Sequence, residues 1–422
     1  DNIQRGRQLL AQLNHPNITT RFDTAVWNIT PERRLFLYGG TGEKEVTAKR
    51  LIIAAGAYER VMPFPGWTLP GVMTVGGAQL LLKSQGVLAG HKFLLAGTGS
   101  LLGLAGTQLL DAGAEITAVT ELQPRTTFLT LLPRLVGNLA KLGQGVSHHR
   151  QLAAAGVPFK FGHTVVRALG QDGVTGAVIA KVDKHGRRTG TEEELSVDTI
   201  CLNYGFIPAT ELTRLLGCEQ RYHTSQGYLA TLTDENMETS CKNIFAVGEV
   251  RGIGGVEVAL LEGRIAGAAA AQQLNYVASD NAALRKEWKK AREVVDSLGS
   301  AFAVKPDLCE LAGDDVPVCR CEEVTAGEIR HAVDAGVRTL NRLKPWTRVG
   351  MGHCQGRICA PIIAQIAAHH AGESPEIFGA FTARSPIKPI PMSRISDTIE
   401  HGEQLEWEDH ATQYGYVRSR TP

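Results

Sequence analysis

Four cysteines near the C-terminal end of the chain have a spacing typical of metal ligands. One residue separates Cys319 from Cys321, and Cys354 and Cys359 follow after 32 residues, with four residues between them. Four thiolates complete either an iron–sulfur centre or a structural zinc site. Zinc ligands usually occur as Cys-x2-4-Cys pairs, so the one-residue gap favours iron–sulfur, with zinc and four unliganded thiols as the alternatives.

The second cysteine pair lies in a glycine-rich segment, residues 350–359, that an apolar stretch follows. Glycine lets the backbone turn its amide groups toward a bound anion. Pro361 suits the first turn of a helix, and the positive end of that helix would face a negatively charged cluster. Both features agree with a metal–sulfur centre.

A glycine-rich turn follows an apolar run in the middle of the chain. Residues 93–96 are apolar, Gly97 and Gly99 come next, and Leu102 replaces the third glycine of the dinucleotide-binding fingerprint. Glu121 stands 22 residues after Gly99, where an acid is expected to bind a ribose hydroxyl. We therefore predict a Rossmann-like domain here. This domain could bind NAD(P) or another adenine nucleotide, or it could be a packed domain without a ligand.

Two further apolar runs end in tight turns at Gly56 and Gly248. Glu249 follows the second turn, and an apolar helix then begins near Gly255 and Val256. The acid could accept a hydrogen bond from a ribityl hydroxyl, and the helix N-terminus could stabilise negative charge on a reduced flavin. Each run taken alone could equally be a plain buried strand.

The elements that would position these residues alternate between strands and helices. Five apolar runs are predicted as strands: residues 50–54, 92–96, 115–119, 176–182 and 243–247. Helical patterns lie between them, and this alternation predicts an α/β fold built on parallel, Rossmann-like sheets. A charged helical stretch, residues 282–297, is predicted to link these sheets to a small C-terminal module.

The composition is that of a globular chain without a strong electrostatic field. It has 422 residues, 43% of them hydrophobic, and 44 basic against 43 acidic side chains leave a formal net charge of +1. A chain of this length divides into several domains, and its near-neutral charge argues against nucleic acid as a partner. No run approaches the roughly 20 apolar residues that cross a bilayer, so a cytoplasmic protein without a transmembrane segment is predicted. Eight cysteines are too few for a disulfide scaffold.

Three segments carry a resemblance to a known family. Residues 54–60 (AAGAYER), residues 63–72 (PFPGWTLPGV) and the Gly248-Glu249 turn, together with the cysteine set, resemble the family of opine oxidase A-subunits and hydrogen cyanide synthase B-subunits. The resemblance extends from the first helix to about residue 370. Such proteins are similar to flavin reductases with two dinucleotide-binding domains, and they carry an added 2Fe-2S domain similar to bacterioferritin-associated ferredoxin.

The resemblance implies a division of the chain into six segments. They are the remainder of an FAD-binding domain (1–88), a nucleotide-binding-like middle domain (89–205), a return segment of the FAD-binding domain (206–275), a helical linker (276–314), a 2Fe-2S domain (315–372) and an extended C-terminal arm (373–422). The family begins with a strand and a complete glycine turn for the ADP half of FAD. We interpret the start at Asp1 as lacking that segment, which puts FAD binding by this chain alone in question. Ala55 stands where the family has threonine, a minor change that keeps the glycine turn.

The resemblance also implies the cofactors and the residues that hold them. FAD would be lined by Gly56, Gly248, Glu249, Gly255 and Val256. The 2Fe-2S cluster would be bound by Cys319, Cys321, Cys354 and Cys359. Gly97, Gly99 and Glu121 would belong to the nucleotide site of the middle domain, and no catalytic residue is assigned.

The implied function is electron transfer within a hetero-oligomer. A partner subunit resembling an amino-acid oxidase would remove a hydride from an opine, glycine or proline-type amine. This chain would relay the electrons through FAD and the cluster to an acceptor, in the cytoplasm or at the inner membrane through its partners. Two alternatives remain: a self-contained NAD(P)H-dependent flavin reductase, and a non-catalytic iron–sulfur or nucleotide-binding scaffold.

Overall fold

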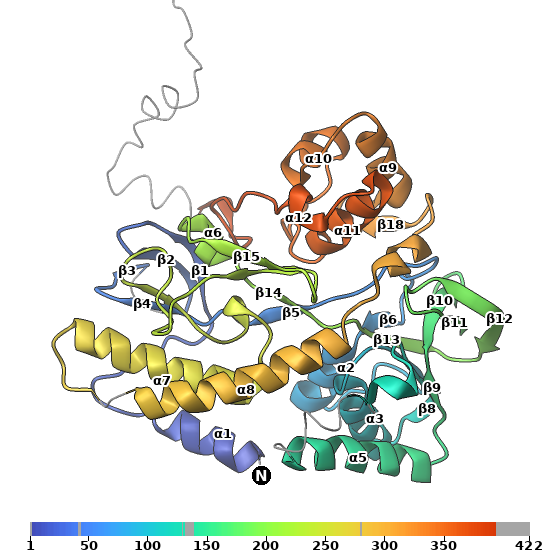
Figure 1. Cartoon of the computed structure of the whole chain (residues 1–422), viewed down its shortest axis with the longest axis horizontal. Coiled ribbons are helices and arrows are strands. Elements are labelled where there is room, and N and C mark those ends of the chain that lie inside the picture. Colours follow the sequence, from blue (N-terminus) through green and yellow to red (C-terminus); the bar gives the residue numbers. More distant parts are fainter. Residues whose placement is uncertain (1, 41–43, 129, 131–138, 279–280, 394–422) are drawn as a thin grey trace, which may run out of the picture. The chain divides into compact units, whose positions relative to one another are not determined.

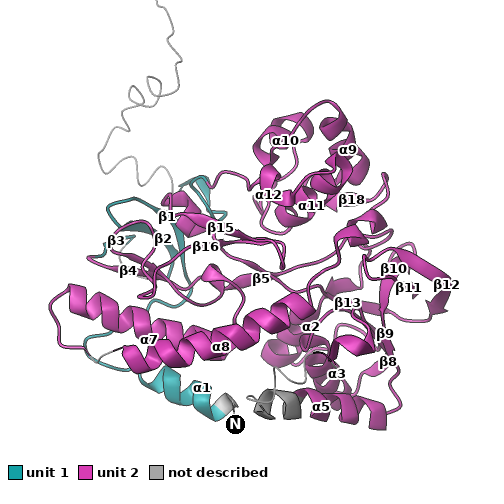
Figure 2. Ribbon diagram, in the orientation of Figure 1, with its two compact units in different colours: residues 1–48, 384–422 teal, residues 49–383 magenta. Residues whose placement is uncertain are grey.

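The structure is a computed structural model that describes residues 2–40, 44–128, 130, 139–278 and 281–393. The chain divides into two compact units, residues 1–48 with 384–422 and residues 49–383 (Figure 2). Residues 394–422 of the predicted C-terminal arm lie outside the described residues.

The smaller unit is built on an antiparallel meander. Its elements are α1 (Asn2–Ala11), β1 (Thr24–Ile29), β2 (Arg34–Gly39) and β3 (Glu45–Thr47). The rings of Trp27 and Phe36 contact each other with centroids 5.4 Å apart. The backbone amide of Ile387 donates to the Trp27 carbonyl at 2.9 Å, which ties the later segment to the meander.

The larger unit contains a five-stranded parallel sheet with strand order β6-β13-β7-β8-β9 (Figure 1). The strands are β6 (Val72–Thr74), β7 (Lys92–Gly97), β8 (Glu115–Glu121), β9 (Phe159–Phe161) and β13 (Thr199–Asn203). The segments that connect them include α2 (Val75–Leu80), η1 (Leu81–Gln85), α3 (Leu101–Asp111) and α5 (Leu139–Ala154). Leu95, Leu109 and Leu152 share one buried core, which explains why central parallel strands are apolar runs.

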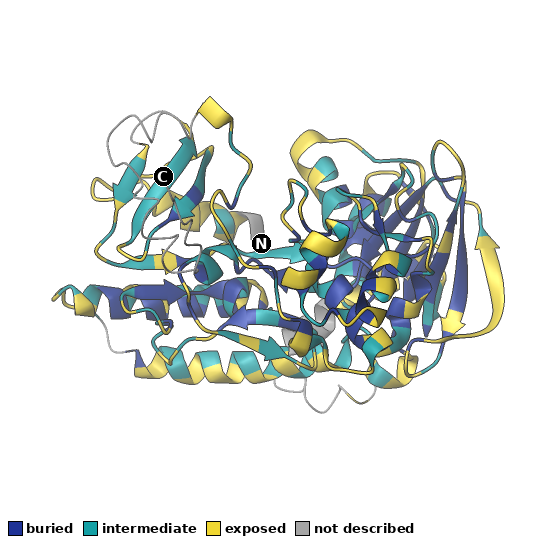
Figure 3. Ribbon diagram, turned by 90° about the horizontal axis from the view of Figure 1, so that it is seen from above, coloured by how far each residue is buried: buried dark blue, intermediate teal, exposed yellow. Residues whose placement is uncertain are grey.

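An antiparallel sheet follows in the chain. It consists of β10 (His163–Leu169), β11 (Gly176–Val182) and β12 (Arg188–Leu195). β11 is almost wholly buried, whereas β12 is exposed along its length; Figure 3 shows the burial of the described residues. The apolar run 176–182 is therefore a strand, as predicted, although its sheet is antiparallel.

The part of the chain with the other two glycine turns has short sheets and two long helices. β4 (Leu51–Ile53) pairs parallel with β17 (Ile244–Ala246), β5 (Ala57–Glu59) pairs antiparallel with β14 (Phe206–Pro208), and β15 (Gln220–His223) pairs antiparallel with β16 (Tyr228–Thr231). The helical elements are α6 (Glu211–Leu215), η2 (Gly248–Arg251), α7 (Gly255–Gln273) and α8 (Ala282–Ala301). α8 packs along α7 through Trp288, so the predicted linker helix is part of the packed structure.

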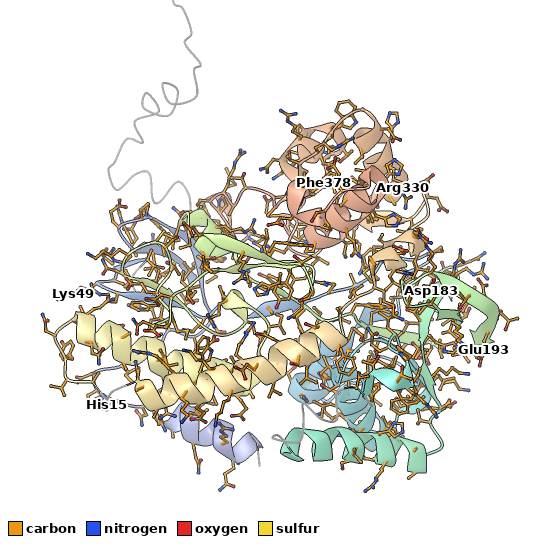
Figure 4. All side chains as sticks on the ribbon, in the orientation of Figure 1. His15, Lys49, Asp183, Glu193, Arg330 and Phe378 are labelled. Atoms are coloured by element: carbon orange, nitrogen blue, oxygen red, sulfur yellow. The ribbon has the colours of Figure 1, made fainter. Side chains whose placement is uncertain are left out.

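The C-terminal module is mainly helical. Its elements are η3 (Pro306–Leu311), β18 (Pro317–Cys319), β19 (Val324–Thr325), α9 (Ala326–Asp334), α10 (Leu340–Thr347), α11 (Ala360–Ala371) and α12 (Pro375–Phe378). Thr325 and Glu328 form a capping box that begins α9. The buried Phe378, labelled in Figure 4, belongs to the core that the module shares with the antiparallel sheet.

These observations confirm the predicted α/β class with Rossmann-like parallel strands. In the described part of the chain, no helix has both the length and the apolar character that spanning a membrane requires.

Candidate functional site

The four cysteines of the C-terminal module lie near the N-terminus of α11. Cys319 ends β18, Cys321 follows it, Cys354 lies in the loop after α10, and Cys359 is the N-cap residue of α11. Each of the two segments contributes two thiols, and hydrogen bonds between the thiols connect all four. The structure thus brings together the residues that the spacing predicted, and their role as cluster ligands stays a prediction.

Hydrogen bonds lower the pKa values of two of the thiols. The Cys359 thiol and nearby backbone amides lower the pKa of Cys319 to about 6. The same thiol and the amide of Gly356 lower the pKa of Cys354 to about 5. The pKa of Cys359 itself is raised, because its thiol interacts with both of these sulfurs and is buried. Thiolate is the form that binds metal, so the site is chemically suited to a cationic metal centre.

The spacing of the sulfurs can be compared with that of a single zinc site. Four sulfurs bound to one tetrahedral zinc would all lie about 3.8 Å apart. Within the described ranges, only Asp307, Glu310 and His369 form a group of metal-ligating side chains whose donor atoms all lie within 4.8 Å of one another. The four cysteine sulfurs do not form such a group in the described residues. The carboxylates of the acidic group pair with Arg187, so we assign no metal to it.

Glycines in the second cysteine loop allow a close approach of Phe381. Gly350 and Gly356 have φ angles of +73° and +78°. A Cβ at Gly350 would lie 2.5 Å from the Phe381 ring, and a Cβ at Gly356 would also collide with that ring. A Cβ at Gly352 would collide with Cys321. Glycine is thus required here both by backbone conformation and by packing.

The predicted nucleotide residues of the middle domain lie at the ends of neighbouring strands. Gly97 ends β7 so close to Asn203 that a Cβ would collide with the Asn203 carbonyl. The amide of Gly99 donates to Glu121 Oε2 at 2.9 Å, and the amide of Gln123 donates to Glu121 Oε1 at 3.0 Å. Burial raises the pKa of Glu121 to about 7. The structure therefore brings the glycine turn and the acid together, but the two bind each other.

Residues that follow α8 cover this acid, which sequence reasoning missed. Gln123 Nε2 donates to the Ala303 carbonyl at 2.8 Å, and Thr98 Oγ1 donates to the Phe302 carbonyl at 3.3 Å. The Glu121 residue is only 4% exposed. A ribose could reach Glu121 only if this cover moved.

A cavity of about 550 Å3 lies beside this region. Its lining includes Arg125, Lys160, His163, Lys181, Lys184, Lys305 and the rings of Phe159 and Phe161. Lys160 pairs with Glu193 at 2.8 Å, and Lys305 donates to the Asp183 carbonyl at 2.9 Å; Asp183 and Glu193 are labelled in Figure 4. The excess of cations would suit an anionic ligand.

The predicted flavin residues lie around the parallel pair β4 and β17. Gly56 and Gly248 have φ angles of +77° and +69°. Glu249 Oε1 accepts a hydrogen bond from the Gly255 amide at 2.7 Å, so the acid caps the N-terminus of α7. Burial raises the pKa of Glu249, while the amides of the α7 N-terminus oppose this shift. Val256, in the first turn of this helix, is 67% exposed.

A second buried acid supports the Gly248 turn and was not predicted. The side chain of Glu262 is fully buried, and its Oε2 accepts a hydrogen bond from the Gly248 amide at 2.7 Å. Its Oε1 accepts from Arg251 at 2.5 Å and from Trp288 at 2.9 Å. Glu262 lies on the same face of α7 as the buried Val258 and Ile265, and an acid within this apolar face was the available signal in the sequence. Glu262 fixes the turn on which a flavin would rest.

The residues present therefore suit both implied cofactors. Four thiols and the surrounding amides suit a 2Fe-2S cluster. The positive-φ turns at Gly56 and Gly248 and the N-terminus of α7 suit the ribityl and ring portions of a flavin.

Comparisons with known proteins show which family the chain resembles. Residues 3–273 match the pyridine nucleotide-disulphide oxidoreductase family, and residues 317–398 match the sarcosine oxidase A3 domain. The chain is 34% identical to the opine oxidase A-subunit of Rhizobium meliloti (strain 1021), over 94% of this chain and 86% of the relative. It is 33% identical to hydrogen cyanide synthase subunit HcnB of Pseudomonas aeruginosa, over 90% of this chain and 83% of the relative.

A solved structure has the same fold over most of the chain. The L-proline dehydrogenase from P. horikoshii matches with a TM-score of 0.69, over 94% of this chain and 69% of the other, at 20% sequence identity. At this identity the match describes the fold alone.

Proposed function

Because the chain belongs to the family of opine oxidase A-subunits and hydrogen cyanide synthase HcnB, within the pyridine nucleotide-disulphide oxidoreductases, we propose that it is the electron-transfer subunit of a heteromeric amine or amino-acid dehydrogenase. The family makes the chain part of an FAD-dependent oxidoreductase. The proposal adds a 2Fe-2S cluster and a relay role to this assignment.

The observation that carries the proposal is the convergence of four thiols from two segments. Cys319 and Cys321 come from one segment and Cys354 and Cys359 from the other, and two of the four have lowered pKa values. A plain buried core has no use for ionised thiols, whereas a cluster requires them. When bound, FAD and a 2Fe-2S cluster would together convert a two-electron hydride transfer into one-electron steps.

The chain's own residues would hold these groups. Gly56 and Gly248 would let the backbone approach the flavin, and Glu249 would accept a hydrogen bond from a ribityl hydroxyl. The positive end of the α7 dipole would stabilise negative charge near the flavin ring. Glu262 would keep the Gly248 turn in place by holding its amide.

The partner in this proposal is a separate catalytic subunit that resembles an amino-acid oxidase. The relatives are named as subunits of opine oxidase and hydrogen cyanide synthase, which supports a hetero-oligomer. The partner would take the hydride from an opine, glycine or proline-type amine, and this chain would pass electrons to an acceptor in solution or at a membrane surface.

An NAD(P)H-dependent flavin reductase is the second candidate, and the cation-lined cavity of the middle domain is the observation that favours it. The covered carboxylate of Glu121 argues against it, because that acid would have to bind the ribose. The relay function is therefore preferred.

The purified complex tests the proposal directly. Its content of FAD, iron and acid-labile sulfide would be measured, and the amine would then be added while flavin absorbance and the electron paramagnetic resonance (EPR) signal of a reduced cluster are followed. We expect both signals to respond to the amine. Stoichiometric zinc without labile sulfide would refute the relay, and a cluster without any flavin would support a scaffold instead.

A further inference from the structure

An ion pair joins the second cysteine loop to helix α6. Arg357 lies between Cys354 and Cys359, and its Nε atom is 3.4 Å from Glu211 Oε1. Its Nη1 atom donates to the carbonyl of Cys354 at 3.1 Å. The guanidinium therefore contacts the backbone of a predicted cluster ligand on one side and a carboxylate of another element on the other.

The guanidinium is buried and incompletely satisfied. The side chain of Arg357 is 8% exposed, and that of Glu211 is 13% exposed. The Nε and Nη2 atoms of Arg357 are buried without a hydrogen-bond acceptor among the residues that the structure describes. Buried cations with unused donors are costly unless an anion lies near.

A second arginine makes the local charge positive. Arg214 lies on α6, and its Nη1 atom donates to the Phe381 carbonyl at 2.5 Å. Burial lowers the pKa of Arg214; the Glu211 carboxylate opposes this shift, and repulsion from Arg357 adds to it. Two guanidiniums against the one carboxylate of Glu211 leave an excess of one positive charge beside the cysteine loop.

The segment that leads into α6 is hydrogen-bonded to the predicted flavin turn. The amide of Ala209 donates to the carbonyl of Gly56 at 3.0 Å, and Glu211 stands two residues after Ala209. A short route therefore connects Gly56 with the loop of Cys354 through a hydrogen bond, two peptide units and the ion pair of Arg357.

We propose that Arg357 is a positioning residue of the relay: it supplies the positive charge that stabilises the reduced cluster, and with Glu211 it holds the cysteine loop against helix α6, whose preceding segment is bonded to the flavin turn. The inference rests on the proposed function. A 2Fe-2S cluster with four thiolates carries two negative charges when oxidised and gains a third on reduction. A buried cation favours the more negative state, so Arg357 raises the reduction potential and Glu211 lowers it.

The test is a redox titration of the purified complex, with the EPR signal of the reduced cluster as readout. Arg357→Met removes the charge and keeps most of the bulk, and it should lower the potential by the equivalent of about a tenfold change in the reduction equilibrium, ~59 mV for one electron. Glu211→Gln should raise the potential. Arg357→Lys should stay near the wild type.

Arg348→Met is the matched control, because Arg348 lies before the same loop and pairs with Glu322 at 3.0 Å while its side chain is 68% exposed. Solvent screening should make its shift much smaller. Damage to the loop would not give opposite signs for Arg357→Met and Glu211→Gln, and it would not be rescued by lysine. Should Arg357→Met fail to fold, the rise expected for Glu211→Gln decides the question.

Two outcomes would overturn the inference in different ways. If wild-type complex shows a cluster signal but the shift for Arg357→Met is no larger than that for Arg348→Met, or Glu211→Gln lowers the potential, the inference alone is wrong. If wild-type complex contains no labile sulfide and no cluster signal, the proposed function is wrong and the inference with it.

Discussion

The carboxylate of Glu121 accepts a hydrogen bond from the backbone amide of Gly99 at 2.9 Å, so two groups that would each bind part of a dinucleotide bind each other. The amide is then occupied and cannot bind a pyrophosphate, and the acid is closed off from a ribose by the residues after α8.

NADH should consequently fail to reduce the flavin of the intact complex at a rate comparable with that of the amine substrate. The physical reason is that nucleotide binding would have to break the bond between Glu121 and Gly99 and displace Phe302. Stopped-flow absorbance of the flavin, with NADH in one experiment and the amine in the other, measures the two rates. Rapid bleaching by NADH would favour the reductase function.

Glu121 should make the stability of the protein depend on pH. Burial raises its pKa from 4.5 to about 7, so the folded chain keeps a proton that the unfolded chain releases. The group does not affect stability below pH 4.5; its cost grows as pH rises through this window and reaches about 3 kcal/mol above pH 7. Glu121→Gln cannot ionise, so its unfolding free energy relative to wild type should rise by that amount across the window. Parallel pH profiles of urea unfolding would contradict this.

The thiol of Cys359 should be essential for the metal centre, because it contacts the sulfurs of both Cys319 and Cys354. Cys359→Ser should lose most of the iron and acid-labile sulfide that the wild type contains, as measured by chemical analysis of the purified complex. Cys218→Ser is the control: Cys218 is a buried thiol outside the set, and its hydroxyl replacement should retain the cluster. Equal metal content in both variants would remove Cys359 from the ligand set.

Gly356 should tolerate alanine poorly because two costs combine. A left-handed conformation costs a residue with a Cβ about 1–2 kcal/mol, and the Cβ would also collide with the ring of Phe381. Gly372→Ala is the control, since Gly372 has a φ of +67° with open space around its Cβ position and should show the conformational cost alone. The two variants would be compared by thermal unfolding and by cluster content. Equal losses of stability would show that the Phe381 ring can move away from the added Cβ at little cost.

Some parts of the site could be predicted from sequence because they depend on local chemistry. The strand before Gly97 is an apolar run, since central parallel strands are buried on both faces. The cysteine set could be recognised from ligand type and spacing. Contacts between distant residues could not be predicted, because they arise only from tertiary packing. Gln123 and Ala303 are 180 residues apart in sequence, and nothing local to either residue indicates that they meet.

The ion pair of Arg357 and Glu211 escaped prediction for the same reason. From sequence, an arginine inside a cysteine loop is expected to be a solvated side chain. In the structure Arg357 is buried, and a buried cation needs a nearby anion. The role of Glu249 also depended on packing: its carboxylate caps the helix whose N-terminus was predicted to face the flavin.

Glu262 should be the acid whose loss most affects the flavin turn. Its carboxylate is fully buried and binds both the Arg251 guanidinium and the Gly248 amide. Glu262→Gln would leave Arg251 as a buried cation without a carboxylate, which should cost about 3 kcal/mol of stability in chemical unfolding. Because the Gly248 turn would loosen, the purified complex should also retain less FAD.

An exposed ion pair provides the comparison for Glu262. Arg338 and Glu373 pair at 3.3 Å with side chains 42% and 32% exposed. Glu373→Gln should cost no more than about 1 kcal/mol and should leave FAD content unchanged, because water screens both charges. If Glu262→Gln lowers stability without any loss of FAD, the acid supports the fold alone. If both variants behave alike, the buried carboxylate does not hold the turn, and the positive-φ conformation of Gly248 must be maintained by the strand that precedes it.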